Sequence, residues 1–481
     1  MITSFQEFKN AYLNFDRITV YKEMAGDLDT PVSLLGKFLS QDNLFLLESA
    51  KENKTYSRFS FLSFGLEEPI ILKHNGFYKN ERKLGDLEYL KNEIKNNLSY
   101  SNNMFGNFSG GFVGYFTFEA VEKSSILKKE LLKKPEILAL LYFVEKFLAY
   151  DNYTNRLYLG LSYKFNKKIS AEENFKIARN SIMKYYDEIM KKGETREESS
   201  QQEPVILSSS FSKKEFKDIV VKIKQLIEEG EAIQVVISNF IDIKGIDAFE
   251  FYRNLRRINP SPYMYFFKHK DLSIVGSSPE IHIKARGSIA TMKPIAGTKP
   301  RGKTDEEVQK NKNELVNDEK EKAEHLMLVD LARNDLSRLA KKDSVNVKNF
   351  MHPEEFSHVI HLVSEVQAEI RQDFDMVDLI TNTLPAGTLS GAPKVRAIEI
   401  IDSIEKEPRN IYGGCIGYIG FNNNMDMAIT IRTAVFEKDR ARFQAGAGIV
   451  YDSNPENEYN ETINKLKALL KAGGINDSFD R

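Results

Sequence analysis

Short segments rich in aromatic and aliphatic residues recur along this chain, and their grouping constrains the fold more than any other feature. In the first part of the chain they are separated by glycine and asparagine, as in NLFLLES, PIILKHNGFY, GGFVGYFTF and NRLYLGLSY. Such segments are typical of antiparallel strands joined by turns. Later strand-like runs also cluster instead of alternating strictly with helices. This pattern predicts an α+β fold with large antiparallel sheets and argues against a doubly wound fold.

Helix signals and strand-like runs organise the second half of the chain. The residue pattern predicts helices over residues 213–229 and 305–340, and Asn454 followed by Pro455 predicts the start of a last helix. The runs LSIVGSSPEIHIKA and MDMAITIRTAVFEK are each predicted as strand. Residues 193–204, GETREESSQQEP, indicate a linker between an N-terminal region, residues 1–192, and a second region, residues 205–475.

Composition excludes several classes of function. The 68 basic and 69 acidic side chains give a formal net charge of −1, so no overall field attracts nucleic acid or an anionic membrane. A single cysteine, Cys415, rules out an internal disulfide framework and a thiolate metal cluster. The polar start MITSFQEFKN and the lack of a run of about 18 apolar residues predict a cytoplasmic protein without export signal or membrane span.

Residues suited to ligand binding are concentrated between residues 385 and 461. Three glycine-rich turns lie there or at its edge, LPAGTLSGAPKVRA, YGG and AGAG, and Arg432 lies in the apolar run between the last two. Glycine lets backbone N–H groups approach a ligand closely, and arginine binds a carboxylate through two parallel hydrogen bonds. Together they predict a site for a small metabolite that carries a carboxylate.

Two pairs of glutamates, each three residues apart, are each placed on one face of a predicted helix. Glu321 and Glu324 lie where an acidic stretch becomes apolar, and Glu458 and Glu461 lie at the start of the last helix. Acidic residues in such places are often structural, and that alternative stays open for both pairs. Together the pairs could supply the few protein oxygens that Mg²⁺ takes while it keeps water and substrate as ligands.

Three further residues have both a chemical and a structural interpretation. Cys415 in GGCIG matches part of a nucleophile elbow, but the sequence continues as strand where an elbow needs a helix, so a buried thiol is predicted. His361 lies on a strand-like run, where a histidine is more often structural than catalytic. Glu280 follows a proline in a run that indicates buried strand, where burial would raise its pKa and suit it to act as a general acid.

Taken together, these strings resemble the chorismate-utilising enzymes, and among them the anthranilate synthase component I family. The resemblance covers residues 212–470 and rests on ten segments: QVVISNF, NPSPYMYF, GSSPE, KPIAGTKPRG, EHLMLVDLARNDLSR, HVIHLVSEV, LPAGTLSGAPKVRAIEIID, YGGCIGY, TIRTAV and GAGIVYDSNPENEYNET. It implies large antiparallel sheets stacked in a sandwich with helices outside. It also implies a lyase that converts chorismate and ammonia to anthranilate and pyruvate, the first committed step of tryptophan biosynthesis.

The resemblance also implies roles for single residues. Glu280 would protonate the departing hydroxyl, Thr388 would line the catalytic site, and His361 would act in the elimination of pyruvate. Mg²⁺ would be held by Glu324 and Glu461, with help from Glu321 and Glu458, and would bind the ring carboxylate. The implied substrate-binding residues are Gly297, Thr298, Tyr412, Arg432, Gly446, Ala447 and Gly448.

Two positions imply which nucleophile adds to the ring. Family members that add water carry a lysine base where this chain has Gln234, and those that make aminodeoxychorismate carry a lysine where it has Ala296. Glutamine and alanine cannot replace lysine as base or nucleophile, so ammonia is implied, supplied by a glutamine amidotransferase subunit. An aminodeoxychorismate or salicylate synthase is the alternative within the enzyme class.

The N-terminal region resembles the family more thinly. LLESAKENKTYSRFSF, residues 46–61, is similar to the motif with which anthranilate synthases bind tryptophan as feedback inhibitor, and Glu48, Ser49, Pro262, Tyr263 and Met264 would form that pocket. The structural alternative is a half-buried strand that ends in a solvated loop. GGFVGYFTFEAV departs from the family's more usual aspartate and has Phe118 and Glu119. A non-catalytic tryptophan-binding regulator is the alternative outside the enzyme class.

Overall fold

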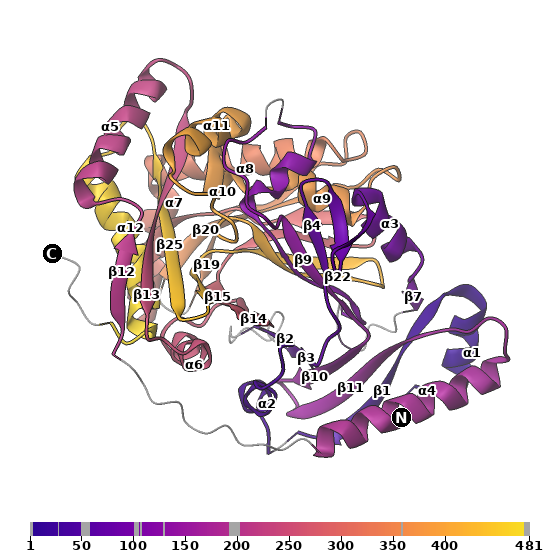
Figure 1. Ribbon diagram of the computed structural model, residues 1–481. Coiled ribbons are helices and arrows are strands. Elements are labelled where there is room, and N and C mark those ends of the chain that lie inside the picture. Colours follow the sequence, from indigo (N-terminus) through magenta and orange to yellow (C-terminus); the bar gives the residue numbers. More distant parts are fainter. Residues whose placement is uncertain are drawn as a thin grey trace.

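The computed structural model describes residues 3–26, 28–49, 58–100, 105, 108–127, 130–191, 203–356 and 359–475. Within these residues the chain forms two large sheets that lie face to face, with helices on their outer surfaces (Figure 1). The α+β sandwich expected from the sequence is therefore confirmed.

The first sheet has thirteen strands among the described residues. In spatial order they are β12 (Val205–Ser209), β13 (Gln234–Lys244), β25 (Arg440–Ile449), β24 (Thr433–Glu437), β15 (Leu272–Ser278), β14 (Tyr263–His269), β2 (Asn43–Glu48), β3 (Phe59–Phe64), β10 (Lys146–Asp151), β11 (Arg156–Lys164), β1 (Arg17–Ala25) and β7 (Ser99–Tyr100), with β21 (Gly391–Ala392) beside β13. Its pairs are antiparallel except for β1 with β7.

The second sheet has twelve strands in the same described ranges, and its pairs are antiparallel. In order they are β18 (Ile295–Pro300), β20 (Val359–Glu369), β17 (Ile289–Met292), β16 (Ile281–Arg286), β23 (Asn424–Ile429), β22 (Cys415–Gly420), β8 (Gly111–Phe116), β9 (Ala139–Val144), β4 (Ile70–Lys73), β5 (Gly76–Lys79) and β6 (Arg82–Gly85), with β19 (Asn346–Glu355) beside β20. Both sheets combine strands from regions 1–192 and 205–475, and residues 193–202 of the predicted linker lie outside the described ranges.

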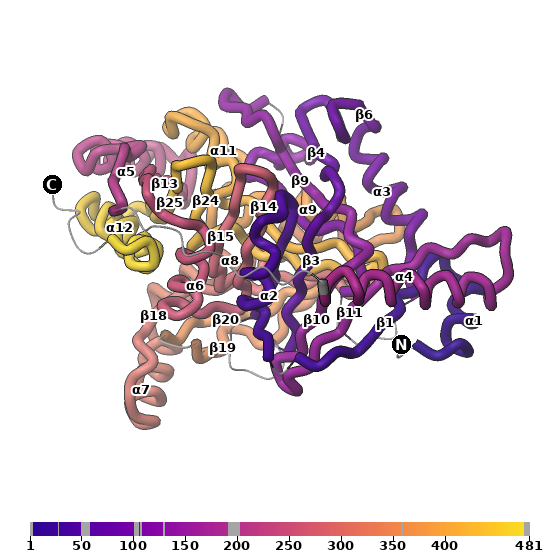
Figure 2. The backbone as a smooth tube through the Cα atoms, turned by 60° about the horizontal axis from the view of Figure 1, so that its bottom comes forward, coloured from indigo at the N-terminus to yellow at the C-terminus, as the bar shows by residue number. Residues whose placement is uncertain are grey.

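Helices cover the outer faces of the two sheets. They are α1 (Phe5–Asn14), α2 (Pro31–Lys37), α3 (Leu87–Lys95), α4 (Ala171–Lys191), α5 (Lys213–Glu228), α6 (Ala248–Ile258), α7 (Asp305–Asn317), α8 (Glu319–Ser337), α9 (Met376–Thr383), α10 (Gly387–Ser390), α11 (Lys394–Ile404), α12 (Pro455–Ala472) and the 3₁₀ helix η1 (Phe118–Lys123). Figure 2 shows α7 extending from the body of the molecule. Among the described residues, no helix is both long and apolar enough to cross a membrane.

The helix ends follow the capping residues in the sequence. Ser212 and Glu215 form a capping box at the start of α5, and Asn454 accepts from the backbone N–H groups of two residues in the first turn of α12. The predicted helix over residues 305–340 is instead two helices, because the side chain of Asp318 caps a new one, α8.

Aromatic residues fill the space between the sheets. Phe45, Tyr265 and Phe267 of the first sheet pack there with Tyr115 and Tyr142 of the second. Clusters of aliphatic and aromatic side chains lie between each sheet and its helices. Cys415 is fully buried on β22, and burial raises the pKa of its thiol, as expected for a structural group and not for an elbow nucleophile.

Two runs predicted as single strands each divide between the two sheets. The first run leaves the first sheet after β15, at Pro279, which has no backbone N–H to donate. It then enters the second sheet as β16. The second run leaves β23 after Ile429 and enters the first sheet as β24, through Arg432 in the left-handed region at φ 48°. The two crossovers are joined, since the N–H of Ile429 donates to the carbonyl of Glu280 at 3.0 Å and that of Ser277 to the carbonyl of Arg432 at 3.1 Å.

Candidate active site

Glu280 lies at the first crossover, where it is buried at 8% exposure. The hydroxyl of Thr388, on the short helix α10, donates to its Oε1 at 3.1 Å. Burial raises the pKa of Glu280 to about 7, against the lowering effects of the Thr388 hydrogen bond and the charges of Arg432 and Lys465. A carboxyl group in this state can donate a proton near neutral pH.

Arg432 lies at the second crossover, close enough to Glu280 for the two charges to interact. Burial lowers the pKa of Arg432, while Glu280 opposes that shift. Residues 279–280 and 430–432 are the connections by which the chain passes between the sheets, so the backbone fixes both side chains. A buried acid and a half-buried cation thus lie close enough to interact at the place where the chain passes between the sheets.

Tyr412 and the glycines of β25 form the next part of the site. A Cβ on Gly446 would lie 3.0 Å from the Tyr412 hydroxyl and 2.8 Å from the carbonyl oxygen of Ile237. The carbonyl of Gly446 accepts a hydrogen bond from Lys465 Nζ on α12 at 2.8 Å. Only glycine fits this close approach of strand, tyrosine and helix.

Gln234 contacts the last glycine of this stretch. A Cβ on Gly448 would lie 2.6 Å from Gln234 Nε2 at the start of β13, so the amide lies directly on that backbone. The side chain of Ala447 points the other way, into a cluster with Ala397 and Ile398. Of the predicted Gly446, Ala447 and Gly448, the alanine can therefore offer a ligand only its backbone.

His361, on β20, forms a second group with Gly297 and Thr298. Its Nδ1 lies 2.6 Å from the carbonyl oxygen of Gly297 and 3.2 Å from the hydroxyl of Thr298. Because a carbonyl only accepts, Nδ1 carries the proton in this bond. The carboxylate of Glu321 lies beside the same turn, with Oε2 3.0 Å from the place of a Cβ on Gly297.

The four predicted Mg²⁺ ligands lie on α8 and α12. Burial, then repulsion by Glu324 and Asp318, raises the pKa of Glu321, and burial with repulsion by Glu461 raises that of Glu458. Glu324 and Glu461 each pair with a lysine one helical turn away, Lys320 at 3.7 Å and Lys465 at 2.7 Å. Crowded carboxylates of this kind fit a divalent cation chemically.

The positions of these carboxylates do not by themselves form a metal site. Within the described part of the chain, no three His, Cys, Asp or Glu side chains group closely enough to hold an ion. The charge of Lys320 on α8 acts to lower the pKa of Glu458 on α12, so charges on the two helices interact. The four-carboxylate Mg²⁺ site stays a prediction.

The predicted inhibitor residues lie on the adjacent strands β2 and β14 and beside them. Met264 pairs with Glu48, whose carboxylate accepts from Tyr252 and, at 3.2 Å, from Arg256 of α6 on the outer face. Tyr263 reaches across to the second sheet, where its hydroxyl donates to Asp426 at 2.8 Å. The hydroxyl of Ser49 is buried and has no partner in the described ranges. Pro262 precedes β14, and residues 50–57 of the motif lie outside the described residues.

The family model described as chorismate binding enzyme matches residues 43–471 of the chain. The chain belongs to this family. This chorismate binding enzyme is 40% identical over 495 residues to anthranilate synthase component 1 of Aquifex aeolicus (strain VF5), a match that covers 98% of the chain and 97% of that protein. It is 38% identical to the component 1 of Acetivibrio thermocellus, with 97% of each chain covered.

Solved structures give the same result. Anthranilate synthase component I from Streptococcus pneumoniae TIGR4 aligns with a TM-score of 0.71 at 32% identity, over 86% of this chain and 92% of that one. The menaquinone-specific isochorismate synthase of Escherichia coli aligns with a TM-score of 0.69 over 94% of each chain, but at 17% identity it shows the fold alone. The resemblance to the chorismate-utilising enzymes and to component I is confirmed.

Lys465 is the main site residue of this chorismate binding enzyme that sequence reasoning missed. It lies four residues after Glu461 on α12, and it contacts that glutamate, the carbonyl of Gly446 and, through its charge, Glu280. The spacing of four residues after a predicted metal ligand was the available signal. A lysine on an amphipathic helix is usually solvated, so the signal was weak.

Proposed function

We propose that this chorismate binding enzyme is the large subunit of an anthranilate synthase, which converts chorismate and ammonia to anthranilate and pyruvate. The observation that carries the proposal is the glutamine against Gly448. Gln234 lies where a water-adding enzyme needs a lysine base, and Ala296, next to Gly297 on β18, lies where a nucleophilic lysine would be. The relatives named anthranilate synthase component 1, 36–40% identical over almost the whole chain, support the same reaction.

The site residues divide the work of binding and proton transfer. Arg432, Tyr412 and the backbone N–H groups of Gly446 and Gly448 would hold the enolpyruvyl carboxylate. Glu280, held by Thr388, would give its proton to the departing hydroxyl as the amine bond forms. Mg²⁺ bound by Glu321, Glu324, Glu458 and Glu461 would supply charge that holds the ring carboxylate and polarises the ring.

Glutamine hydrolysis needs a second subunit. The only cysteine of the chain, Cys415, is fully buried within the second sheet, and burial raises its pKa, so it offers no thiolate. A glutamine amidotransferase partner would release the ammonia that this subunit uses.

The purified chain is expected to form anthranilate from chorismate and Mg²⁺ with an ammonium salt, but not with glutamine, because it lacks a thiolate nucleophile. Anthranilate fluorescence and the mass of the product check this. Glutamine-dependent activity without a second subunit would refute the partner. Aminodeoxychorismate or salicylate as the product would favour the alternative enzymes.

Tryptophan is expected to inhibit the ammonium-dependent reaction. Of the residues predicted for this inhibitor, Ser49, whose hydroxyl is buried without a partner among the described residues, and the ring of Tyr263 would offer polar and aromatic contacts, whereas Glu48 bonds to α6 on the outer face of the sheet. Initial rates with increasing tryptophan, and with phenylalanine as the matched control, measure the effect. Equal inhibition by both amino acids, or none, would contradict a tryptophan site.

A further inference from the structure

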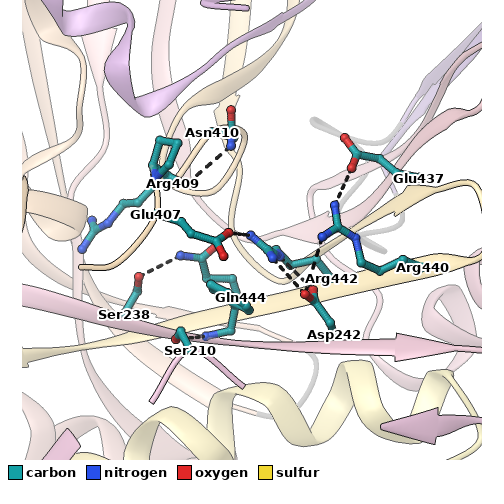
Figure 3. A network of polar contacts seen from close by, with 12 residues as sticks. Ser210, Ser238, Asp242, Glu407, Arg409, Asn410, Glu437, Arg440, Arg442 and Gln444 are labelled. Carbon is teal, nitrogen blue, oxygen red and sulfur yellow. Dashed lines mark hydrogen bonds and ion pairs between the residues drawn. The ribbon is translucent and has the colours of Figure 1, made fainter. Parts of the chain in front are cut away.

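Arg409 is a buried arginine that the proposed reaction does not use. Its side chain is 1% exposed and pairs with Glu405, which is 6% exposed, at 2.6 Å. Its guanidinium lies over the ring of Phe118, with 4.6 Å from Cζ to the ring centroid. In Figure 3 its side chain points away from Arg440 and Arg442, which form their own network with Asp242, Glu407 and Glu437.

The hydrogen bonds of Arg409 lead to segments that carry site residues. Nη1 donates to the carbonyl of Leu389 at 2.6 Å, and Leu389 directly follows Thr388 on α10. Nη2 donates to the carbonyl of Val236 at 2.7 Å, on the strand that begins at Gln234. One side chain thus contacts both the helix that holds Glu280 and the strand that lies against Gly448.

The partners of Arg409 extend these contacts. Glu405 Oε1 accepts from the backbone N–H and the hydroxyl of Ser238, each at 2.8 Å, on the same strand β13. On the other side, Glu119 accepts from the backbone N–H of Arg409 at 2.6 Å and from that of Asn410 at 3.1 Å. Because Tyr412 follows two residues after Asn410, these bonds fix the turn that presents Tyr412 to Gly446.

The chemistry of this cluster depends on the planar guanidinium. An arginine presents five donors in a rigid fork, whereas a lysine presents three donors on one nitrogen and cannot span the same acceptors. Removing the arginine would leave Glu405 as a buried, uncompensated charge and the carbonyls of Leu389 and Val236 without their donor. These losses act directly on the backbone of three segments that build the site.

We propose that Arg409, with Glu405 and Glu119, is a positioning residue that sets the relative places of Thr388, Gln234 and Tyr412 around the substrate without touching it. The proposal rests on the proposed function, because its kinetic test uses the proposed reaction of chorismate with ammonia. A shift of about 1 Å in reacting groups can cost about 10²-fold in rate. Arg409→Met is therefore expected to lower kcat/KM by about that factor.

A matched control is the buried Arg17, which lies on β1. It also pairs with a glutamate, Glu145, donates to a backbone carbonyl and lies over aromatic rings, but its partners carry no site residue. Arg17→Met is expected to lower the melting temperature as Arg409→Met does, while kcat and KM stay near the values of the parent protein. Arg409→Lys keeps a cation in the cluster and is expected to fold, yet to share the loss in kcat/KM.

The experiment measures kcat, KM for chorismate and the pH dependence of kcat with ammonium as nucleophile, below the melting temperature of each variant. The hydrogen bond from Thr388 is one of the contacts that lower the pKa of Glu280, beside the charges of Arg432 and Lys465. If α10 loosens, this bond weakens and the pKa of Glu280 rises. The alkaline limb of kcat should therefore move to higher pH. Unchanged kcat/KM and pH profile in both Arg409 variants, or an equal loss in Arg17→Met, would overturn the proposal.

The two proposals can fail separately. If the parent protein does not turn over chorismate with ammonium, the proposed function fails. Equilibrium binding of chorismate to the parent protein and to Arg409→Lys, measured by calorimetry, then still tests the positioning role, and equal affinities would sink it. Weaker binding by Arg409→Lys, with Arg17→Met unchanged, would support it.

Discussion

Replacement of Glu280 by glutamine is expected to lower kcat by about 10²–10⁴, the usual contribution of a single general acid. Glutamine has nearly the same shape and can still accept the Thr388 hydrogen bond, which the carboxylate receives at 3.1 Å. It cannot, however, release a proton to the departing hydroxyl. Because the backbone crossover and not the carboxylate fixes this position, the variant is expected to fold and to bind chorismate.

The pH dependence provides a second measurement on the same residue. Burial raises the pKa of Glu280 from 4.5 to about 7, so the protonated acid is plentiful up to about neutral pH and activity that needs it falls above that. Between pH 4.5 and 7 the unfolded chain has lost this proton while the folded chain retains it. Stability from this group is therefore complete below the unfolded pKa and is lost as pH rises through the folded value.

Glu280→Gln removes this pH-dependent loss of stability, because glutamine does not ionise. The variant is expected to be more stable than its parent above pH 7, by up to about 3 kcal/mol for a shift of this size. Urea unfolding of both proteins at pH 5 and pH 8 measures the difference. Glu48→Gln serves as control, since Glu48 is also buried but bonds to Tyr252 and Arg256 away from the site. Near-full turnover by Glu280→Gln would show that another group supplies the proton.

The sequence predicts the local structure of this chain well, because local structure depends on neighbouring residues. The helix predicted to begin at residue 213 does begin at Lys213, Asn454 caps the last helix as predicted, and aromatic runs predict strands of the two sheets. The resemblance selects residues that the structure does bring together, among them Glu280 with Thr388 and His361 with Gly297.

What the sequence could not predict is how the strands pass between sheets. Two runs with continuous strand patterns change sheet midway, at Pro279 and at Arg432, and these changes place the acid beside the arginine. Hydrophobic periodicity is the same on either side of such a crossover, so it carries no information on which sheet follows. Lys465 and Arg409 escaped notice for a related reason, since their roles arise from contacts with residues distant in the sequence.

Replacement of His361 by alanine is expected to lower anthranilate formation by about 10²–10⁴ while amination of the ring continues. The bond from Nδ1 to the carbonyl of Gly297 fixes the tautomer, so in the neutral ring Nε2 is the nitrogen that can accept a proton. If that nitrogen serves the elimination of pyruvate, the variant should accumulate an aminated ring that still carries its enolpyruvyl group. Mass spectrometry of quenched reactions detects this species.

The comparison with Glu280→Gln makes this test decisive. Loss of the acid slows departure of the hydroxyl, so Glu280→Gln should not accumulate the aminated intermediate, whereas His361→Ala should form it and stop there. His361→Asn is the matched variant, because its amide can still donate to the carbonyl of Gly297 but offers no basic nitrogen. If His361→Asn restores anthranilate formation, the histidine acts by holding the Gly297 turn. If it accumulates the same intermediate as the alanine variant, the imidazole takes part in the elimination itself.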